Sequence, residues 1–157
     1  MKTLLTMGET MACLVPEASG NLRYINGYRM TMAGAESNLA IDASKLGIPT
    51  RWFSRLGRDE FGLMIRNRIR GEGVDCSSVL FDDVRPTGLM CKQIGSGESH
   101  VFYYRAGSAA AAMDETDITS ELWKDVGVLH LTGITPVLSE SCQRAVEKAF
   151  FEAEYRG

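Results

Sequence analysis

The pattern of hydrophobic and polar positions changes its period several times along the chain, and each change marks a predicted element. A short apolar run over residues 3–7 closes on a polar turn, which predicts a buried first strand. Residues 36–46 repeat apolar side chains at helical spacing and end at Gly47, a typical C-cap residue. Residues 59–70 and 139–155 show the same helical period. The pattern therefore predicts three amphipathic helices after a buried strand.

Strand-like runs fill the intervals between these helices, over residues 11–15, 21–25, 28–33, 51–56, 79–81, 87–94, 100–106 and 128–132. Asn26-Gly27 separates two of these runs and is the strongest short signal for a hairpin. The segment Gly95-Ser96-Gly97-Glu98-Ser99 predicts the glycine-rich turn of a second hairpin. Alternating strands and helices predict an α/β fold with a parallel sheet flanked by helices. The two strand-rich insertions, about residues 11–33 and 87–106, can pair into a small accessory sheet.

Composition narrows the class of protein. A chain of 157 residues with 45% hydrophobic residues is long enough for one packed domain, which we expect to span residues 1–157. The formal net charge of −3 lacks the basic excess typical of nucleic-acid binding. The apolar N-terminal run is too short for a signal peptide or a membrane span. Four cysteines without a Cys-x-x-Cys pair predict reduced thiols in a cytoplasm, and the two distant histidines predict no zinc site.

A small-residue turn before the first predicted helix is the first candidate for chemistry. Gly34 allows a close approach of the backbone to a ligand, and the amides that follow it stand at a helix N-terminus, where polar or anionic groups are stabilised. Asn38 lies one turn inside and reaches the same space. We therefore expect a ligand to contact Gly34, Ala35, Glu36 and Asn38.

A second candidate lies on the predicted strand Val101-Phe102-Tyr103-Tyr104-Arg105. Because side chains alternate along a strand, Tyr103 and Arg105 share one face. A guanidinium binds a carboxylate through two parallel hydrogen bonds, so this pair suits a ligand that carries hydroxyls and a carboxylate. A solvated strand face with a packing tyrosine is the alternative that the spacing leaves open.

Together with Gly57-Arg58-Asp59-Glu60-Phe61-Gly62, the run Ala33-Gly34-Ala35-Glu36-Ser37-Asn38 resembles the N-terminal signature of the PfkB (ribokinase-like) family of sugar kinases. The resemblance implies a ribokinase-like fold in which the accessory sheet is a lid over the sugar. Phe102-Tyr103-Tyr104-Arg105 before Gly107-Ser108-Ala109 is similar to the branch that phosphorylates 2-keto-3-deoxygluconate. In that branch an arginine of this kind meets the carboxylate of the sugar acid.

The resemblance also implies roles for Glu9 and Met90. Glu9 ends the first strand at its carboxyl edge, where ligands sit in open α/β sheets, and relatives often use an aspartate near this place to hold sugar hydroxyls. A simple exposed turn is the alternative. Thr87-Gly88-Leu89-Met90 matches the family's strand that enters the lid, although the acidic-sugar branch commonly has a tyrosine where this chain has Met90. Met90 is expected to be an apolar contact of the lid.

Ribokinase-like enzymes are roughly twice this long, and their second half binds ATP with Mg²⁺ and carries a general-base aspartate in a Gly-Ala-Gly-Asp-like turn. Neither that turn nor a Walker-type phosphate loop occurs in this sequence. We therefore expect a sugar-binding N-terminal half that is inactive alone, and a homo-oligomer that forms through the lid. Two alternatives stay open. One is another PfkB kinase, such as a fructokinase or a 5-dehydro-2-deoxygluconate kinase. The other is a truncated, non-catalytic sugar-binding or oligomerisation module.

Overall fold

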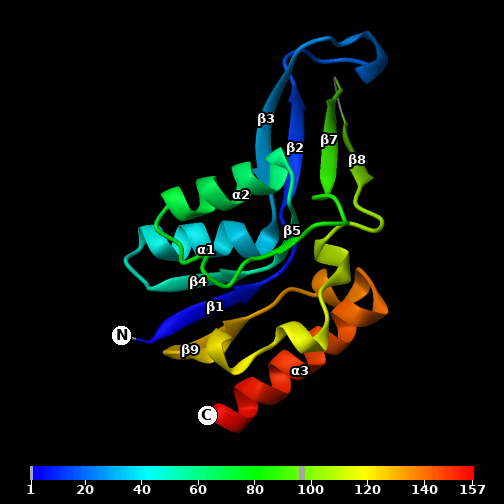
Figure 1. Ribbon diagram of the computed structural model, residues 1–157. Helices are drawn as coiled ribbons and strands as arrows, with labels where there is room; N and C mark the ends of the chain where they lie inside the picture. Colours follow the sequence, from blue (N-terminus) through cyan, green and yellow to red (C-terminus); the bar gives the residue numbers. More distant parts are fainter. Residues whose placement is uncertain (1, 96–97) are drawn as a thin grey trace.

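The central layer of the molecule is a parallel sheet of three strands in the order β4-β1-β9, seen in a computed structural model that describes residues 2–95 and 98–157 (Figure 1). β1 spans Thr3–Met7, β4 spans Thr50–Phe53 and β9 spans Val126–His130. Both neighbours pair with β1 in parallel. The middle strand is covered on both faces, as its short apolar run predicts. β9 begins two residues before the predicted strand.

Helices cover the two faces of this sheet. α1 (Ala35–Lys45) and α2 (Glu60–Gly71) lie on one side, and α3 (Glu140–Arg156) lies on the other (Figure 1). Neighbouring residues of β4 point to opposite faces. Trp52 accordingly packs in the cluster beneath α1 and α2, and Phe53 packs in the cluster beneath α3. All three helices agree with the predicted ranges to within two residues.

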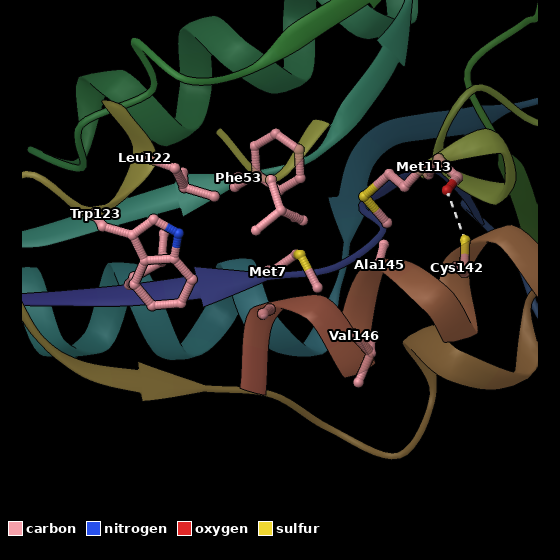
Figure 2. Close-up of a cluster of buried hydrophobic side chains, with 12 residues drawn as sticks. Met7, Phe53, Met113, Leu122, Trp123, Cys142, Ala145 and Val146 are labelled. Carbon is pink, nitrogen blue, oxygen red and sulfur yellow. Dashed lines mark hydrogen bonds between the residues drawn. The ribbon is translucent and has the colours of Figure 1, made fainter. Parts of the chain in front are cut away.

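The α3 side carries the larger apolar cluster (Figure 2). Met7 and Phe53 of the sheet face Ala145 and Val146 of α3 there. Three short 3₁₀ turns that the sequence pattern did not predict lie in the chain segment beside this cluster: η2 (Ala110–Ala112), η3 (Glu115–Asp117) and η4 (Ser120–Trp123). η2 and η4 bury side chains in this cluster, and because these residues follow no regular period, the sequence pattern did not predict the turns.

The two strand-rich insertions form one accessory sheet in the order β3-β2-β7-β8, which projects beyond the helices (Figure 1). Its strands are β2 (Met11–Pro16), β3 (Tyr28–Ala33), β7 (Leu89–Ile94) and β8 (Ser99–Tyr104). β2 pairs antiparallel with β3 and parallel with β7, and β7 and β8 form an antiparallel hairpin. Ser96 and Gly97, in the predicted turn of that hairpin, lie outside the described residues.

The predicted Asn26-Gly27 hairpin is wrong. The segment before it is not a strand but the 3₁₀ turn η1 (Leu22–Tyr24), and β3 instead pairs with β2 over six residues. Tyr28 donates its hydroxyl to the carbonyl of Leu22 at 3.1 Å, which keeps η1 against the start of β3. Six paired residues outweigh a local turn preference.

A third, two-stranded sheet connects the central sheet to the accessory sheet. It pairs β5 (Arg55–Gly57) with β6 (Leu80–Asp82) in parallel. The single strand predicted over residues 51–56 is thus divided at Ser54 between two sheets. After β9 the chain passes through η5 (Thr135–Val137) into α3. Of the helices in the described ranges, none combines the length and the apolar character needed to cross a bilayer.

We predict that Phe53→Ala lowers the free energy of unfolding by about 3–5 kcal/mol, because it removes a ring that is only 1% exposed and leaves a cavity between β4 and α3. Phe150→Ala is the matched control, since Phe150 lies on α3 but is 54% exposed. Urea unfolding followed by circular dichroism measures both changes. A loss for Phe150→Ala as large as that for Phe53→Ala would contradict this description of the core.

Candidate functional site

A buried ion pair lies where the central sheet meets the accessory sheet. The Nη2 atom of Arg105 lies 2.5 Å from Oε2 of Glu9. Arg105 directly follows β8, and Glu9 is the second residue after β1. Glu9 is 4% exposed, so the interpretation of this residue as an exposed turn is wrong. A carboxylate taken out of water needs a partner, and Arg105 supplies the opposite charge.

A tight turn brings two side chains to this one carboxylate. The N–H of Ser108 donates to the carbonyl of Arg105 at 3.0 Å, and Gly107 between them has a φ of +71°. This positive φ at the third position of a β-turn favours glycine. Ser108 Oγ donates to Glu9 Oε1 at 2.7 Å, while Arg105 approaches Oε2. Both ends of the turn are therefore held by Glu9.

Two glycines leave room for Glu9. A Cβ on Gly88 would lie 2.5 Å from Glu9 Oε1, and a Cβ on Gly34 would lie 2.7 Å from the carbonyl oxygen of Glu9. Both distances are shorter than van der Waals contact permits. Gly34 and Arg105 thus approach Glu9 from opposite ends of its residue, one at the main chain and one at the carboxylate.

Tyr103 and Met90 lie on the accessory sheet next to this pair. They are directly opposite each other in the β7–β8 register and so share one face of the sheet. The Arg105 guanidinium lies 5.8 Å from the centre of the Tyr103 ring, in the range of a cation–π contact. Met90 is buried and packs with Met11 and Cys13, an apolar contact of the kind expected.

The start of α1 separates the other predicted residues into two groups. Ala35 and Asn38 are exposed on the first turn, and Gly34 is half-buried before them. Glu36 is 1% exposed, and its Oε1 accepts hydrogen bonds from Thr132 at 2.5 Å and Thr135 at 3.2 Å. The sequence groups Glu36 with the ligand-facing residues, whereas here its carboxylate binds the segment that follows β9.

A family model described as the pfkB family carbohydrate kinase matches residues 1–155. The chain belongs to this family. A 2-dehydro-3-deoxygluconokinase of Thermoproteus tenax is 40% identical to it, over 99% of this chain and 49% of that protein. One of Bacillus subtilis (strain 168) is 37% identical, over 86% of this chain and 42% of that protein. The chain therefore spans about half the length of the curated relatives it matches.

Solved structures agree with this assignment. The PfkB protein from Polaromonas sp. JS666 superposes with a TM-score of 0.95 at 34% identity, over 100% of this chain and 53% of that chain. The ribokinase-like α/β fold expected from the sequence is thereby confirmed.

Within residues 2–95 and 98–157, no three His, Cys, Asp or Glu side chains are placed together to hold a metal ion. The cluster at Glu9 pairs its carboxylate with an arginine instead.

Asp59, a residue of the PfkB signature, positions a segment next to the site, a role that the sequence pattern did not single out. It caps α2, with its Oδ1 accepting the N–H of Gly62 at 2.8 Å, and its Oδ2 accepts the N–H of Thr87 at 2.8 Å. Thr87 Oγ1 in turn accepts the N–H of Gly57 at 2.9 Å. Asp59 thus fixes the segment that enters β7 and brings Gly88 to Glu9.

Burial alone would raise the pKa of Asp59, but the hydrogen bonds from Thr87 and Gly62 outweigh it, and the pKa is lowered overall. A carboxyl whose pKa is lowered by folding stabilises the folded state at pH values above its ordinary pKa, which is near 4. That stability is lost as the pH falls through the lower pKa of the folded state.

We predict that Asp59→Asn costs about 1–2 kcal/mol of stability near neutral pH, since its amide cannot accept from both N–H groups. The difference from wild type should shrink as the pH falls below about 4, where the unfolded wild-type chain begins to take up a proton at this carboxyl, and it should be lost below the lower pKa of the folded state. Urea unfolding between pH 7 and pH 2.5 measures it. Asp83→Asn is the control, because Asp83 forms an exposed ion pair and should change stability little. A difference that stays constant down to pH 2.5 would contradict the role of the charge.

Proposed function

We propose that this chain is the sugar-binding part of an ATP-dependent sugar-acid kinase whose substrate is 2-keto-3-deoxygluconate. The observation that carries the proposal is the Arg105 guanidinium, held at the junction of the two sheets beside Tyr103. The relatives of 40% and 37% identity, each named 2-dehydro-3-deoxygluconokinase, support the same substrate. In this proposal the reaction moves the γ-phosphoryl group of ATP to the terminal hydroxyl of the sugar acid.

Six of the candidate residues have a proposed role at this site. Arg105 binds the carboxylate of the sugar acid, and Tyr103 covers the sugar from the accessory sheet, which acts as a lid. Gly34, Ala35 and Asn38 meet the sugar at the start of α1, where backbone N–H groups point outward. Met90 supplies an apolar wall.

We propose that ATP and Mg²⁺ bind mainly to the part of the protein that corresponds to the uncovered half of the relatives. ATP supplies the phosphoryl group when it is bound there. The general-base aspartate is placed in the same part. Phosphoryl transfer depends on positioning and on charge stabilisation of the phosphates, and none of the described residues is assigned to that task.

One observation favours a neutral sugar as the second candidate. Arg105 already has an opposite charge at Glu9, so the pair adds no net positive charge to the site. A fructokinase or a 5-dehydro-2-deoxygluconate kinase would keep the same fold around such a neutral pair. A non-catalytic sugar-binding module is the third reading, and only the sugar-binding half of the proposal applies to it.

We predict that Arg105→Ala weakens binding of 2-keto-3-deoxygluconate to the chain by roughly tenfold or more, because loss of a charge-assisted pair costs about 1.5–3 kcal/mol. Binding of 3-deoxyfructose, which carries a hydroxymethyl group in place of the carboxylate, should change far less. Isothermal titration calorimetry with both sugars measures the difference.

Arg70→Ala is the control for charge, because Arg70 is an exposed arginine on α2. It removes the same +1 and should leave both affinities unchanged. Equal effects of Arg105→Ala on the acidic and the neutral sugar would exclude a carboxylate role for Arg105 and favour the neutral-sugar candidate.

We also propose that the chain self-associates through the accessory sheet. β8 is an edge of that sheet, and it exposes Phe102 by 44% and Tyr104 by 66%. An unpaired strand edge with exposed aromatic side chains favours pairing with a second copy.

We predict a dimer or larger species in sedimentation velocity, which Phe102→Asp shifts toward monomer by placing a charge on that edge. Phe150→Asp, at an exposed position on α3, should leave the assembly intact. A monomeric wild-type chain, or disruption by Phe150→Asp alone, would exclude the lid as the interface.

A further inference from the structure

The carboxylate of Glu9 contacts an arginine and a serine, and its side chain is 1% exposed, which leaves little access for the sugar hydroxyl that the sequence suggests. We infer that Glu9 is a positioning residue that holds the Arg105 guanidinium in place for the carboxylate of the sugar acid. The inference rests on the proposed function, and it assigns Glu9 no contact with the sugar.

Glu9 is fixed firmly enough to hold another side chain. Its side chain is 1% exposed, and Ser108 donates to one carboxylate oxygen at 2.7 Å. The α-carbon of Gly88 packs against the same oxygen, where a Cβ would lie at 2.5 Å. The carboxylate therefore has little room to move, and Arg105 has one defined partner for its Nη2 atom.

Arg105 keeps donors for a second carboxylate. A guanidinium has five N–H donors, and the contact with Glu9 involves the Nη2 atom. The Nε atom is buried and has no hydrogen-bond partner among the described residues. The side chain is 23% exposed, so part of it is open to a ligand. Because Glu9 and the Tyr103 ring order this flexible side chain in advance, little rotamer freedom is left to lose on binding.

A rival account gives Glu9 only the task of balancing the charge of Arg105. The two accounts predict opposite effects of removing Glu9 on the preference for an acid. If Glu9 only balances charge, its removal leaves Arg105 more positive and raises affinity for any acid. If Glu9 positions the guanidinium, removal of its acceptor lowers the preference for the acid over the neutral sugar.

The experiment compares three variants by calorimetry with 2-keto-3-deoxygluconate and 3-deoxyfructose, and it reports the ratio of the two dissociation constants. Glu9→Gln keeps an acceptor for Arg105 without the charge and should keep the wild-type ratio within about threefold. Glu9→Ala removes the acceptor and should lower the preference for the acid about tenfold, which is about 1.4 kcal/mol. Gly88→Ala should lower it similarly, because its Cβ displaces the carboxylate while every polar group remains. Should Glu9→Ala fail to fold, Gly88→Ala carries the test.

Ser108→Ala is the control for a purely structural role. It removes one bond to Glu9 but leaves the pair with Arg105, so the ratio should not change. An unchanged ratio in Glu9→Ala and Gly88→Ala, or a raised affinity for the acid in Glu9→Gln, would overturn the positioning role while leaving the proposed function intact. A wild-type chain without preference for the acid, together with no effect of Arg105→Ala, would overturn the proposed function itself.

Discussion

Two carboxylates, those of Glu9 and Glu36, are buried near the carboxyl end of β1, and they are the constraint around which this region of the molecule is organised. A buried carboxylate is costly unless it is paired or hydrogen-bonded, so its surroundings must supply partners and space. Glu9 takes an arginine and a serine from the turn after β8, and Glu36 takes two threonine hydroxyls from the segment after β9. Glu9 thereby connects the end of the first strand, and Glu36 the first helix, to a segment that lies more than ninety residues later in the chain.

Gly8 and Gly88, which lie next to these acids, have a common explanation. A Cβ on Gly8 would lie 2.2 Å from the carboxyl carbon of Glu36, just as one on Gly88 would meet Glu9. Neither glycine has a positive φ, so space explains them and a special turn does not. Gly107 is the opposite case, since its φ is positive and nothing lies within 4 Å of an added Cβ. The same residue type thus serves two separate physical needs within one site.

Much of the fold could be predicted because its signals are local. Apolar spacing placed α1, α2 and α3, and the sharing of a face by Tyr103 and Arg105 followed from strand alternation. The failures are cases where a distant partner decides. Asn26-Gly27 carries a hairpin signal, but β2 is the partner that β3 takes. Residues 110–123 bury side chains in short 3₁₀ turns, and no period reveals such a segment.

The candidate site shows the same contrast between local signals, which the sequence reveals, and distant partners, which it does not. From the sequence alone, Glu9, Glu36 and Arg105 are all candidates for contact with a ligand, because residue type and spacing do not show which charges meet. In the folded chain Glu9 and Arg105 neutralise each other, and Glu36 is enclosed by threonines. A carboxylate seen in sequence beside a sugar-kinase glycine turn therefore has two possible uses, contact with the sugar or support of a residue that makes that contact. Burial bears on the choice between these two uses, because Ala35 and Asn38 are exposed on the first turn of α1, whereas Glu9 and Glu36 are both buried.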